Sequence, residues 1–429
     1  MTDRKRRRTS DRGNRRRSAK VKSRKQRKQN KGRMIFCIAM EMIVVLILVL
    51  VVGWNYGMGT QLVEWIEQMR KPVVKELDIS GINSPYAVLM QVRGGRVIGE
   101  INGDQQMYPA SMTKIMTTIV AIENLKDLDQ EITLTNEMFE GLYEQDATQA
   151  GFQPGETVRA IDLLYGVMLP SGAECCIALA DTISGSEADF VALMNEKAAK
   201  LGMSGTNFCD TTGLHDANHY STAKDIAVLL KYALRNDTFR KIIESPYHST
   251  PATNIHPDGI TFYSTMFKNL SDTVVTDGQI MGGKTGYTSK CRYTLVTYAK
   301  KNGTTLVSVI MRAPNSPWTA PDANEYTDTT RILNYCFENY KRYEIGTTTD
   351  NTVNTSDLFT KYSSYYNQQS GPLSVEQGAG VMLPKGVTLD KAQKKVIYYD
   401  TPQQVSATKK VIGKITYTYN GKEAGGAEI

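Results

Sequence analysis

Three short motifs along the chain carry side chains that can act together in acyl transfer. They are Ser111-Met112-Thr113-Lys114, Ser171-Gly172-Ala173 and Lys284-Thr285-Gly286. Residues i and i+3 share one face of a helix, so the amine of Lys114 can reach the hydroxyl of Ser111. Lysine accepts a proton at neutral pH only when burial or a nearby cation lowers its pKa, and Lys284 can be that cation. The motifs therefore predict a serine hydrolase whose base is lysine rather than histidine.

The Ser-x-x-Lys spacing is not distinctive by itself, because it recurs at Ser221 to Lys224 and at Ser406 to Lys409. Only Ser111 follows an expected strand-to-helix turn and precedes the other two motifs. Lys-Thr-Gly occurs once, after glycines and before two β-branched runs, where we expect an edge strand beside a cleft. At such an edge Lys284 and Thr285 can bind a substrate carboxylate, and the glycines let a substrate backbone approach closely.

The elements that must position these motifs follow the order strands, helices, strands. Gly-Gly at 94–95 and Lys-Asn-Gly at 301–303 predict hairpin turns, the second between strands 294–299 and 305–311. Helical periodicity covers 112–125, 159–169, 173–183, 187–201, 223–234 and 329–340. Strand-like runs at 395–399 and 409–419 predict a small β domain over 347–429. We expect an α+β fold with an antiparallel sheet.

The basic character of the chain, with a formal charge of +7, comes from its N-terminal tail. Residues 1–33 hold 17 Lys and Arg against 2 Asp, out of 51 basic and 44 acidic residues in all, so the remainder is net acidic. Such a tail can bind nucleic acid, or it can flank a membrane segment on the cytoplasmic side. The apolar residues 34–53, with Glu41 as their only charge, favour the membrane segment.

We therefore expect a cytoplasmic tail at 1–33, a transmembrane signal-anchor at 34–53 and a stalk at 54–75. Everything beyond the anchor is placed outside the cell membrane, and nucleic-acid binding is not expected. A cleaved signal peptide is the other possibility, but no small-x-small site follows the apolar run. The cysteines at 175, 176, 209, 291 and 336 form no recognisable disulfide or metal-site pattern, although a single bridge stays open.

The motifs and their flanks resemble the low-molecular-mass penicillin-binding proteins, which are the serine D-alanyl-D-alanine carboxypeptidases of peptidase family S11. The resemblance covers about residues 76–340 and weakens in the C-terminal β domain. It rests on Tyr108-Pro-Ala-Ser-Met-Thr-Lys114, Pro154-Gly-Glu156, Leu169-Pro-Ser-Gly-Ala-Glu174, Gly213-Leu214, His219-Tyr-Ser-Thr-Ala-Lys224 and Gly282-Gly-Lys-Thr-Gly286. It implies a β-lactamase/transpeptidase-like domain at 76–340, an antiparallel sheet flanked by helices with a helical subdomain.

The resemblance also implies roles for the motif residues. Ser111 would attack the carbonyl between two D-alanines of a peptidoglycan stem peptide and be acylated by β-lactams, and Lys114 would accept its proton. Ser171 would relay protons to the leaving amine. The residues that would bind the substrate, including the terminal carboxylate and the oxyanion, are Lys284, Thr285, Gly286 and Tyr287, together with the backbone N–H of Ser111. No metal or organic cofactor is implied, and His215 and His219 are expected to pack or cap.

The family pattern breaks at Ala173, where the middle motif usually ends in Asn. That amide binds the substrate backbone and helps to orient the catalytic lysine, and Glu174 could replace it only by reaching around the helix start. The expected activity is a D,D-carboxypeptidase. The alternatives are a D,D-endopeptidase, a β-lactamase, or a non-catalytic penicillin-binding scaffold of the cell wall. Cys175 and Cys176, just beyond the altered position, either pack inside the helix or line the cleft.

Overall fold

The computed structural model describes residues 81–270, 272–314, 323–345, 374–404 and 410–429. The chain divides into two compact units, Met1–Val73 and Val74–Ile429, and all of the first unit lies outside the described residues. The expected tail, membrane segment and stalk therefore lie outside the described residues as well. Within the described ranges, no helix has both the length and the apolar character needed to cross a membrane.

A six-stranded antiparallel sheet forms the centre of the described fold, with strand order β2-β1-β12-β11-β10-β9. Its strands are β1 (Tyr86–Gln91), β2 (Val97–Ile101), β9 (Val274–Val275), β10 (Gly278–Thr288), β11 (Arg292–Lys301) and β12 (Thr304–Ala313). The two hairpins expected from the sequence are present as β1–β2 and β11–β12. Asn302 and Gly303 both have positive φ in the second turn, as a tight hairpin requires.

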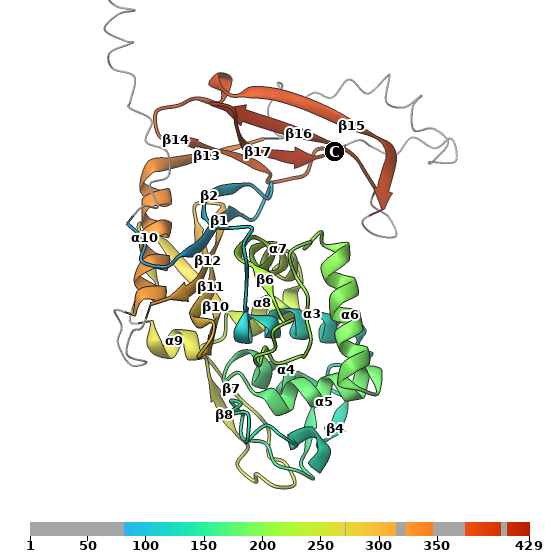
Figure 1. The fold of residues 1–429 in the computed structure, drawn as a ribbon. Coiled ribbons are helices and arrows are strands. Elements are labelled where there is room, and N and C mark those ends of the chain that lie inside the picture. Colours follow the sequence, from blue (N-terminus) through green and yellow to red (C-terminus); the bar gives the residue numbers. More distant parts are fainter. Residues whose placement is uncertain (1–80, 271, 315–322, 346–373, 405–409) are drawn as a thin grey trace, which may run out of the picture. The chain divides into compact units, whose positions relative to one another are not determined.

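The two faces of this sheet bury separate hydrophobic cores because successive side chains of a strand point to opposite sides. Val88 and Met90 of β1 belong to the larger core, and Ala87 and Leu89 belong to the smaller one. The larger core packs against α3 (Lys114–Asn124), α4 (Ala160–Met168), α5 (Ala173–Ser184), α6 (Glu187–Lys200), α7 (Ala223–Ala233) and α8 (Asp237–Ile243). The smaller core packs against α10 (Asn324–Asn339) on the other side (Figure 1).

Short elements complete this part of the fold. They are β3 (Gln106–Met107), η1 (Ala110–Thr113), β4 (Glu131–Thr133), η2 (Asn136–Phe139), β5 (Thr157–Arg159), β6 (Ser221–Thr222), β7 (Tyr247–Ser249), β8 (Thr261–Tyr263) and α9 (Thr265–Asn269). Most predicted helices are found with ends shifted by a few residues, and α10 begins at Asn324 rather than at 329. The α+β class with an antiparallel sheet is confirmed by this arrangement.

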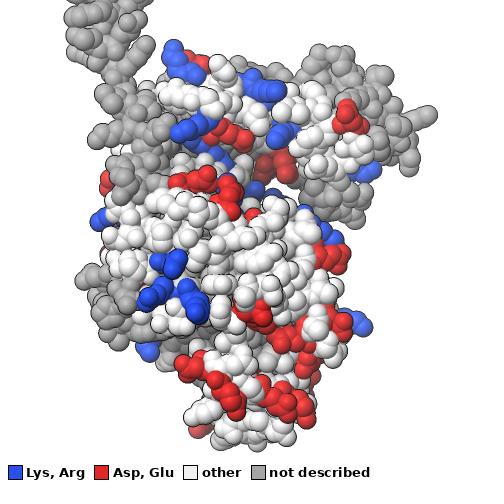
Figure 2. Space-filling view, viewed as in Figure 1, with Lys and Arg blue, Asp and Glu red and all other residues white. Residues whose placement is uncertain are grey.

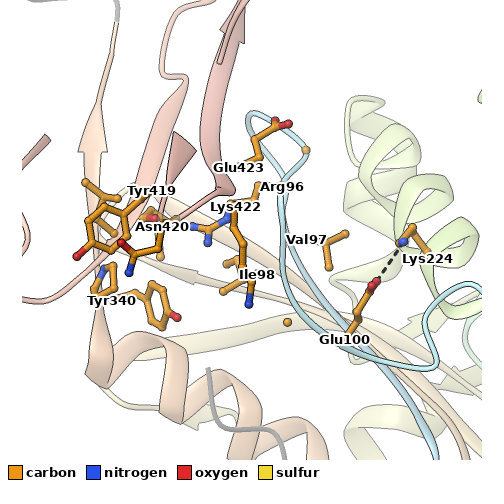
Figure 3. Close-up of a pocket in the computed structure, with 15 residues that line it drawn as sticks. Arg96, Val97, Ile98, Glu100, Lys224, Tyr340, Tyr419, Asn420, Lys422 and Glu423 are labelled. Atoms are coloured by element: carbon orange, nitrogen blue, oxygen red, sulfur yellow. Dashed lines mark hydrogen bonds and ion pairs between the residues drawn. The ribbon is translucent and has the colours of Figure 1, made fainter. Parts of the chain in front are cut away.

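A second antiparallel sheet follows α10, with strand order β13-β14-β17-β16-β15. Its strands are β13 (Tyr340–Glu344), β14 (Gly380–Pro384), β15 (Gln393–Gln404), β16 (Lys410–Tyr419) and β17 (Lys422–Glu428), with the short η5 (Leu389–Lys391) between β14 and β15. Arg96 Nη1 donates to the carbonyl of Met382 at 2.5 Å, which connects this sheet to the β1–β2 hairpin. A cavity of about 610 Å³ lies beside that contact, with Lys224 and Tyr419 among its lining residues (Figure 3).

Candidate active site

Ser111 lies in the 3-10 turn η1, immediately before α3, and the α-helix expected from residue 112 begins only at Lys114. Lys114 Nζ donates to Ser111 Oγ at 3.2 Å and to the carbonyl of Thr212 at 2.7 Å. Lys114 itself is buried, with 3% of its surface exposed. Ala110, just before the serine, has φ 49, a left-handed conformation that costs energy for a residue with a side chain. The turn therefore holds the serine and lysine side by side within a strained backbone.

Gly213 supports this strained turn from the opposite chain segment. Its φ is +83, and a Cβ built on it would lie 1.9 Å from the carbonyl oxygen of Ala110 and 3.0 Å from Ser111 N. Real Cβ atoms essentially never come within 3.0 Å of such a neighbour, so a side chain at 213 would force the turn to move. Only glycine allows the two backbones to lie this close.

A polar network fixes the carbonyl of Thr212 that binds Lys114. Asp210 Oδ1 accepts hydrogen bonds from the backbone N–H groups of Thr212 at 2.7 Å and Gly213 at 2.6 Å. Asp210 Oδ2 lies 2.9 Å from His219 Nδ1, and His219 Nε2 lies 2.8 Å from Thr113 Oγ1. Burial acts to raise the pKa of Asp210, but its hydrogen bonds, led by that with His219, outweigh burial and hold the pKa below its usual value.

Lys284 comes from β10 and is buried beside Lys114, with 1% of its surface exposed. Burial, followed by repulsion from Lys114, lowers the pKa of Lys284 well below its ordinary value. Lys284 Nζ donates to the carbonyl of Thr285 at 3.0 Å, and Thr285 Oγ1 lies 2.7 Å from Thr265 Oγ1 at the start of α9.

The expected edge strand is β10. Its neighbour β9 pairs only with Gly278 and Gln279, so among the described strands nothing pairs with that side of β10 from Lys284 onward. A Cβ on Gly286 would lie 3.1 Å from Ser111 N, which shows how closely this strand passes the nucleophile. Tyr287 follows directly and is 38% exposed. The arrangement leaves the backbone groups of β10 beside Ser111 accessible to an extended peptide.

Ser171 stands between α4 and α5 with φ 75, a second left-handed non-glycine residue among the motifs. It is 6% exposed, and its Oγ has no hydrogen-bond partner within the described residues. A buried hydroxyl without a partner costs free energy unless another group, such as a substrate, completes its bonding. Ala173 begins α5 and is 1% exposed.

Glu174 does not reach into the cleft in place of the missing Asn. It is fully buried, and its Oε1 accepts hydrogen bonds from the backbone N–H groups of Ala150 at 2.6 Å and Gly151 at 3.0 Å. Ala173 N–H donates to the carbonyl of Thr148 at 2.8 Å, so the segment from 148 to 151 is fastened to the start of α5. Burial raises the pKa of Glu174 despite these hydrogen bonds. This segment therefore occupies the space beside Ala173.

The two cysteines after Glu174 are free thiols that pack inside α5 rather than lining a cleft. Both are fully buried, and burial raises the pKa of Cys176 to about 12. The second Ser-x-x-Lys motif is likewise structural. Ser221 Oγ lies 2.8 Å from Thr206 Oγ1, whereas Lys224 pairs with Glu100 (Figure 3) and Asp104. The third motif, at 406 to 409, falls outside the described residues.

Sequence reasoning missed Asp210 and Thr265 and gave His219 only a packing or capping role. Asp210 lies in a Cys-Asp-Thr-Thr-Gly segment whose turn residues were a usable signal, because Asp often binds backbone N–H groups two and three residues ahead. His215 packs edge-on against Tyr108, with 4.6 Å between ring centroids, as a packing role requires.

Residues 73–315 match the sequence pattern of a family described as D-alanyl-D-alanine carboxypeptidase, peptidase family S11. The matched region is more than half of the chain. The chain belongs to this family. As a member of the S11 family it is a serine peptidase, and its α+β fold is that of the D,D-peptidases and penicillin-binding proteins.

Curated relatives of this S11 peptidase include the D-alanyl-D-alanine carboxypeptidase DacF of Bacillus subtilis, 30% identical over 60% of the chain. That match spans 63% of the Bacillus protein's length. DacC of Escherichia coli is 30% identical over 78% of the chain and 80% of its own length. The Streptomyces K15 DD-transpeptidase structure is 26% identical, with a TM-score of 0.52 over 59% of this chain and 97% of its own. Penicillin binding protein 5 of Haemophilus influenzae shares the fold at 24% identity, with a TM-score of 0.59 over 81% of this chain and 96% of its own.

Proposed function

We propose that the chain is a membrane-anchored serine D,D-carboxypeptidase that removes the terminal D-alanine from peptidoglycan stem pentapeptides. The observation that carries the proposal is the 3.2 Å contact between Lys114 Nζ and Ser111 Oγ, with the buried Lys284 beside it. A nucleophile within hydrogen-bond reach of a buried amine is the arrangement that activates a serine hydroxyl without histidine. Membership of the S11 family supplies the substrate class.

In the proposed reaction, Ser111 Oγ attacks the carbonyl carbon between the two D-alanines, and Lys114 takes the hydroxyl proton. The backbone N–H groups of Ser111 and Tyr287 hold the resulting oxyanion. When the peptide bond breaks, the proton passes through Ser171 to the leaving amine, and the rest of the peptide stays on Ser111 as an ester. Water then attacks this ester and gives a proton to Lys114. As the ester bond breaks, Lys114 passes that proton to Ser111 Oγ, so the shortened peptide is released and the hydroxyl is restored.

The terminal carboxylate of the substrate is proposed to bind at Lys284 and Thr285. Burial and Lys114 together disfavour the charged form of Lys284, so an arriving carboxylate stabilises that form and raises its pKa. The hydroxyl of Ser171, buried without a partner in the described structure, gains one when the substrate or its leaving amine is present. Both groups thus interact more favourably with bound substrate than with the empty cleft.

β-Lactams are proposed to acylate the same serine, because their strained amide and neighbouring carboxylate present the groups that these residues bind. We also propose that residues 34–53 anchor the chain in the cell membrane, with its N-terminus in the cytoplasm and the peptidase outside. The sequence supports this placement through the apolar run and its basic flank. Protease accessibility in intact spheroplasts checks the topology, since only an exported peptidase is digested from outside.

The test is D-alanine release from diacetyl-L-Lys-D-Ala-D-Ala by the full chain beside its Ser111→Ala variant. We expect release that is lost in the variant. Intact penicillin labelling of the wild type without cleavage of any peptide substrate would identify a penicillin-binding scaffold. A cross-linked peptide dimer is the second substrate, because cleavage of the dimer alone would identify an endopeptidase. Rapid, complete hydrolysis of benzylpenicillin would instead identify a β-lactamase.

A further inference from the structure

A cavity of about 430 Å³ beside the nucleophile's turn collects two cationic side chains that the reaction above does not use. Lys290 and Arg312 line it together with Gln106, Tyr108 and Tyr220, and no acidic residue is among the lining residues. Two cations around one cavity repel each other, and an anion inside it removes that repulsion. The cavity is therefore complementary to an anionic group.

Arg312 is placed in this cavity by an irregularity of the central sheet. In the pairing of β11 with β12, Tyr293 lies opposite Ala313 but Leu295 lies opposite Ile310, so two residues of β12 face the single residue between them. Such a bulge redirects a side chain out of the regular alternation. Arg312 has φ 57, a left-handed conformation that glycine adopts freely and arginine adopts only at a cost. A costly conformation at a cleft is a reason to look for function in the side chain.

Neither cation is neutralised within the described structure. Lys290 and Arg312 are exposed, and the described residues provide neither of them with an ion pair or a hydrogen bond from the side chain. Acidic side chains gather toward the end of the molecule that holds β4 and α5, whereas the face over β10 and β11 carries a separate group of basic ones (Figure 2). Because Lys290 and Arg312 are the only charged residues that line the cavity, they give it a positive charge.

The cavity lies toward the part of the bound peptide that precedes the scissile bond. Tyr108 comes three residues before Ser111, and Lys290 lies in the turn that follows β10, three residues after Tyr287. The proposed site for the terminal carboxylate, Lys284, is further back along the same strand. A peptide extended along β10 that places its C-terminus at Lys284 therefore runs toward Lys290 with the residues upstream of the scissile bond.

We propose that Lys290 and Arg312 form a subsite for a carboxylate that the donor peptide carries upstream of the scissile bond. This inference rests on the proposed carboxypeptidase function and specifies its substrate. Two sources share this chemistry: the free carboxylate of a γ-linked glutamate in the peptide backbone, and a carboxylate at the end of the side chain before the two D-alanines. The planar guanidinium of Arg312 can bind either one through two parallel hydrogen bonds, while Lys290 adds a point charge.

The experiment compares three peptides ending in D-Ala-D-Ala: diacetyl-L-lysine as the neutral donor, the same donor extended by γ-D-glutamate, and a donor whose side chain ends in a carboxylate. The variants are Arg312→Gly and Lys290→Gln, with Lys126→Gln as a control. Lys126 is also an exposed lysine without an ion pair in the described structure, and it lies outside the cavity. Each variant is measured for kcat/KM and for its denaturation midpoint.

We expect Arg312→Gly and Lys290→Gln each to lower kcat/KM for at least one carboxylate donor by about 5- to 20-fold. For the neutral donor the change stays within about 2-fold, and the preference weakens as salt is raised. The donor for which the variants lose kcat/KM identifies the source of the carboxylate, which is either the γ-linked glutamate or the side chain before the two D-alanines. Arg312→Gly is also expected to raise the denaturation midpoint, since glycine relieves the left-handed backbone, so a loss of selectivity with a gain of stability cannot come from damage to the fold.

The subsite is refuted if wild type has no preference for either carboxylate donor, or if the two cavity variants lose no more selectivity than Lys126→Gln. Turnover of the neutral donor by wild type reports on the proposed function separately. If no donor is turned over, calorimetric affinities of the three peptides for the Ser111→Ala protein decide the question. Equal affinities for neutral and carboxylate peptides then refute the subsite, and tighter carboxylate binding that Arg312→Gly removes supports it.

Discussion

The Gly213→Ala substitution tests whether the close contact behind the nucleophile positions it. The new Cβ would meet the Ala110 carbonyl oxygen at 1.9 Å, whereas ordinary contacts begin at 3.4 Å, so the backbones must separate by about 1.5 Å. The left-handed φ costs about 1–2 kcal/mol for alanine, and overpacking costs about 1–3 kcal/mol more. Because a misplacement of about 1 Å at a reacting group can cost about 100-fold in rate, we expect acylation by a fluorescent penicillin to slow at least that much.

Gly202→Ala is the matched control, because Gly202 has φ +75 but nothing within 4 Å of its Cβ position. It carries the backbone cost of about 1–2 kcal/mol without the collision. We expect it to lower the free energy of unfolding in denaturant and to leave the acylation rate unchanged. The reasoning fails if Gly213→Ala folds and is acylated at the wild-type rate, or if Gly202→Ala loses as much rate as Gly213→Ala.

Three further predictions concern the buried polar groups. Asp210→Ala leaves two backbone N–H groups near Lys114 without an acceptor, so we expect about 1–3 kcal/mol less stability in denaturant and acylation slower by about 10-fold or more; an unchanged rate would exclude a positioning role. Because burial raises the pKa of Glu174, its contribution to stability is present below its unfolded pKa and is lost as pH rises through the folded value. Glu174→Gln should therefore gain stability over wild type as pH rises from the unfolded to the folded pKa. A difference in stability between the two proteins that does not change with pH contradicts this. The pKa of Lys284 is lowered, so its contribution to stability is present above pH 10.5 and is lost as pH falls through the folded value. Lys284→Met should therefore be more stable than wild type at pH 7, by a margin that shrinks toward pH 10.5, and should lose carboxypeptidase activity. An equal margin of stability at both pH values argues against a buried charge.

The sequence could predict the residues of the site better than their local geometry. Ser111 and Lys114 were paired on the assumption of an α-helix, yet they meet in a 3-10 turn. The prediction of contact survives because residues i and i+3 also align in a 3-10 helix. The strand position of Lys284 was likewise predictable, since glycines and β-branched runs mark edge strands and hairpins in the sequence itself.

Contacts between distant segments could not be predicted in the same way. The series of hydrogen bonds from Asp210 through His219 to Thr113 depends on how the loop before β6 folds over η1, and no local sequence pattern encodes that approach. The direction of Glu174 was equally undetermined, because a residue in the first turn of a helix can face either the cleft or a neighbouring loop. In the structure it faces the loop, where the backbone N–H groups of Ala150 and Gly151 donate to its Oε1.

Trapping the intermediate shows whether Ser111 carries the acyl group during hydrolysis. The full chain is mixed with diacetyl-L-Lys-D-Ala-D-Ala, quenched in acid during turnover, digested and examined by mass spectrometry. We expect the donor acyl group as an ester on the peptide that contains Ser111, and no adduct in the Ser111→Ala protein. D-alanine release by wild type with an adduct on another residue, or continued release by Ser111→Ala, would rule out Ser111 as the residue that carries the acyl group.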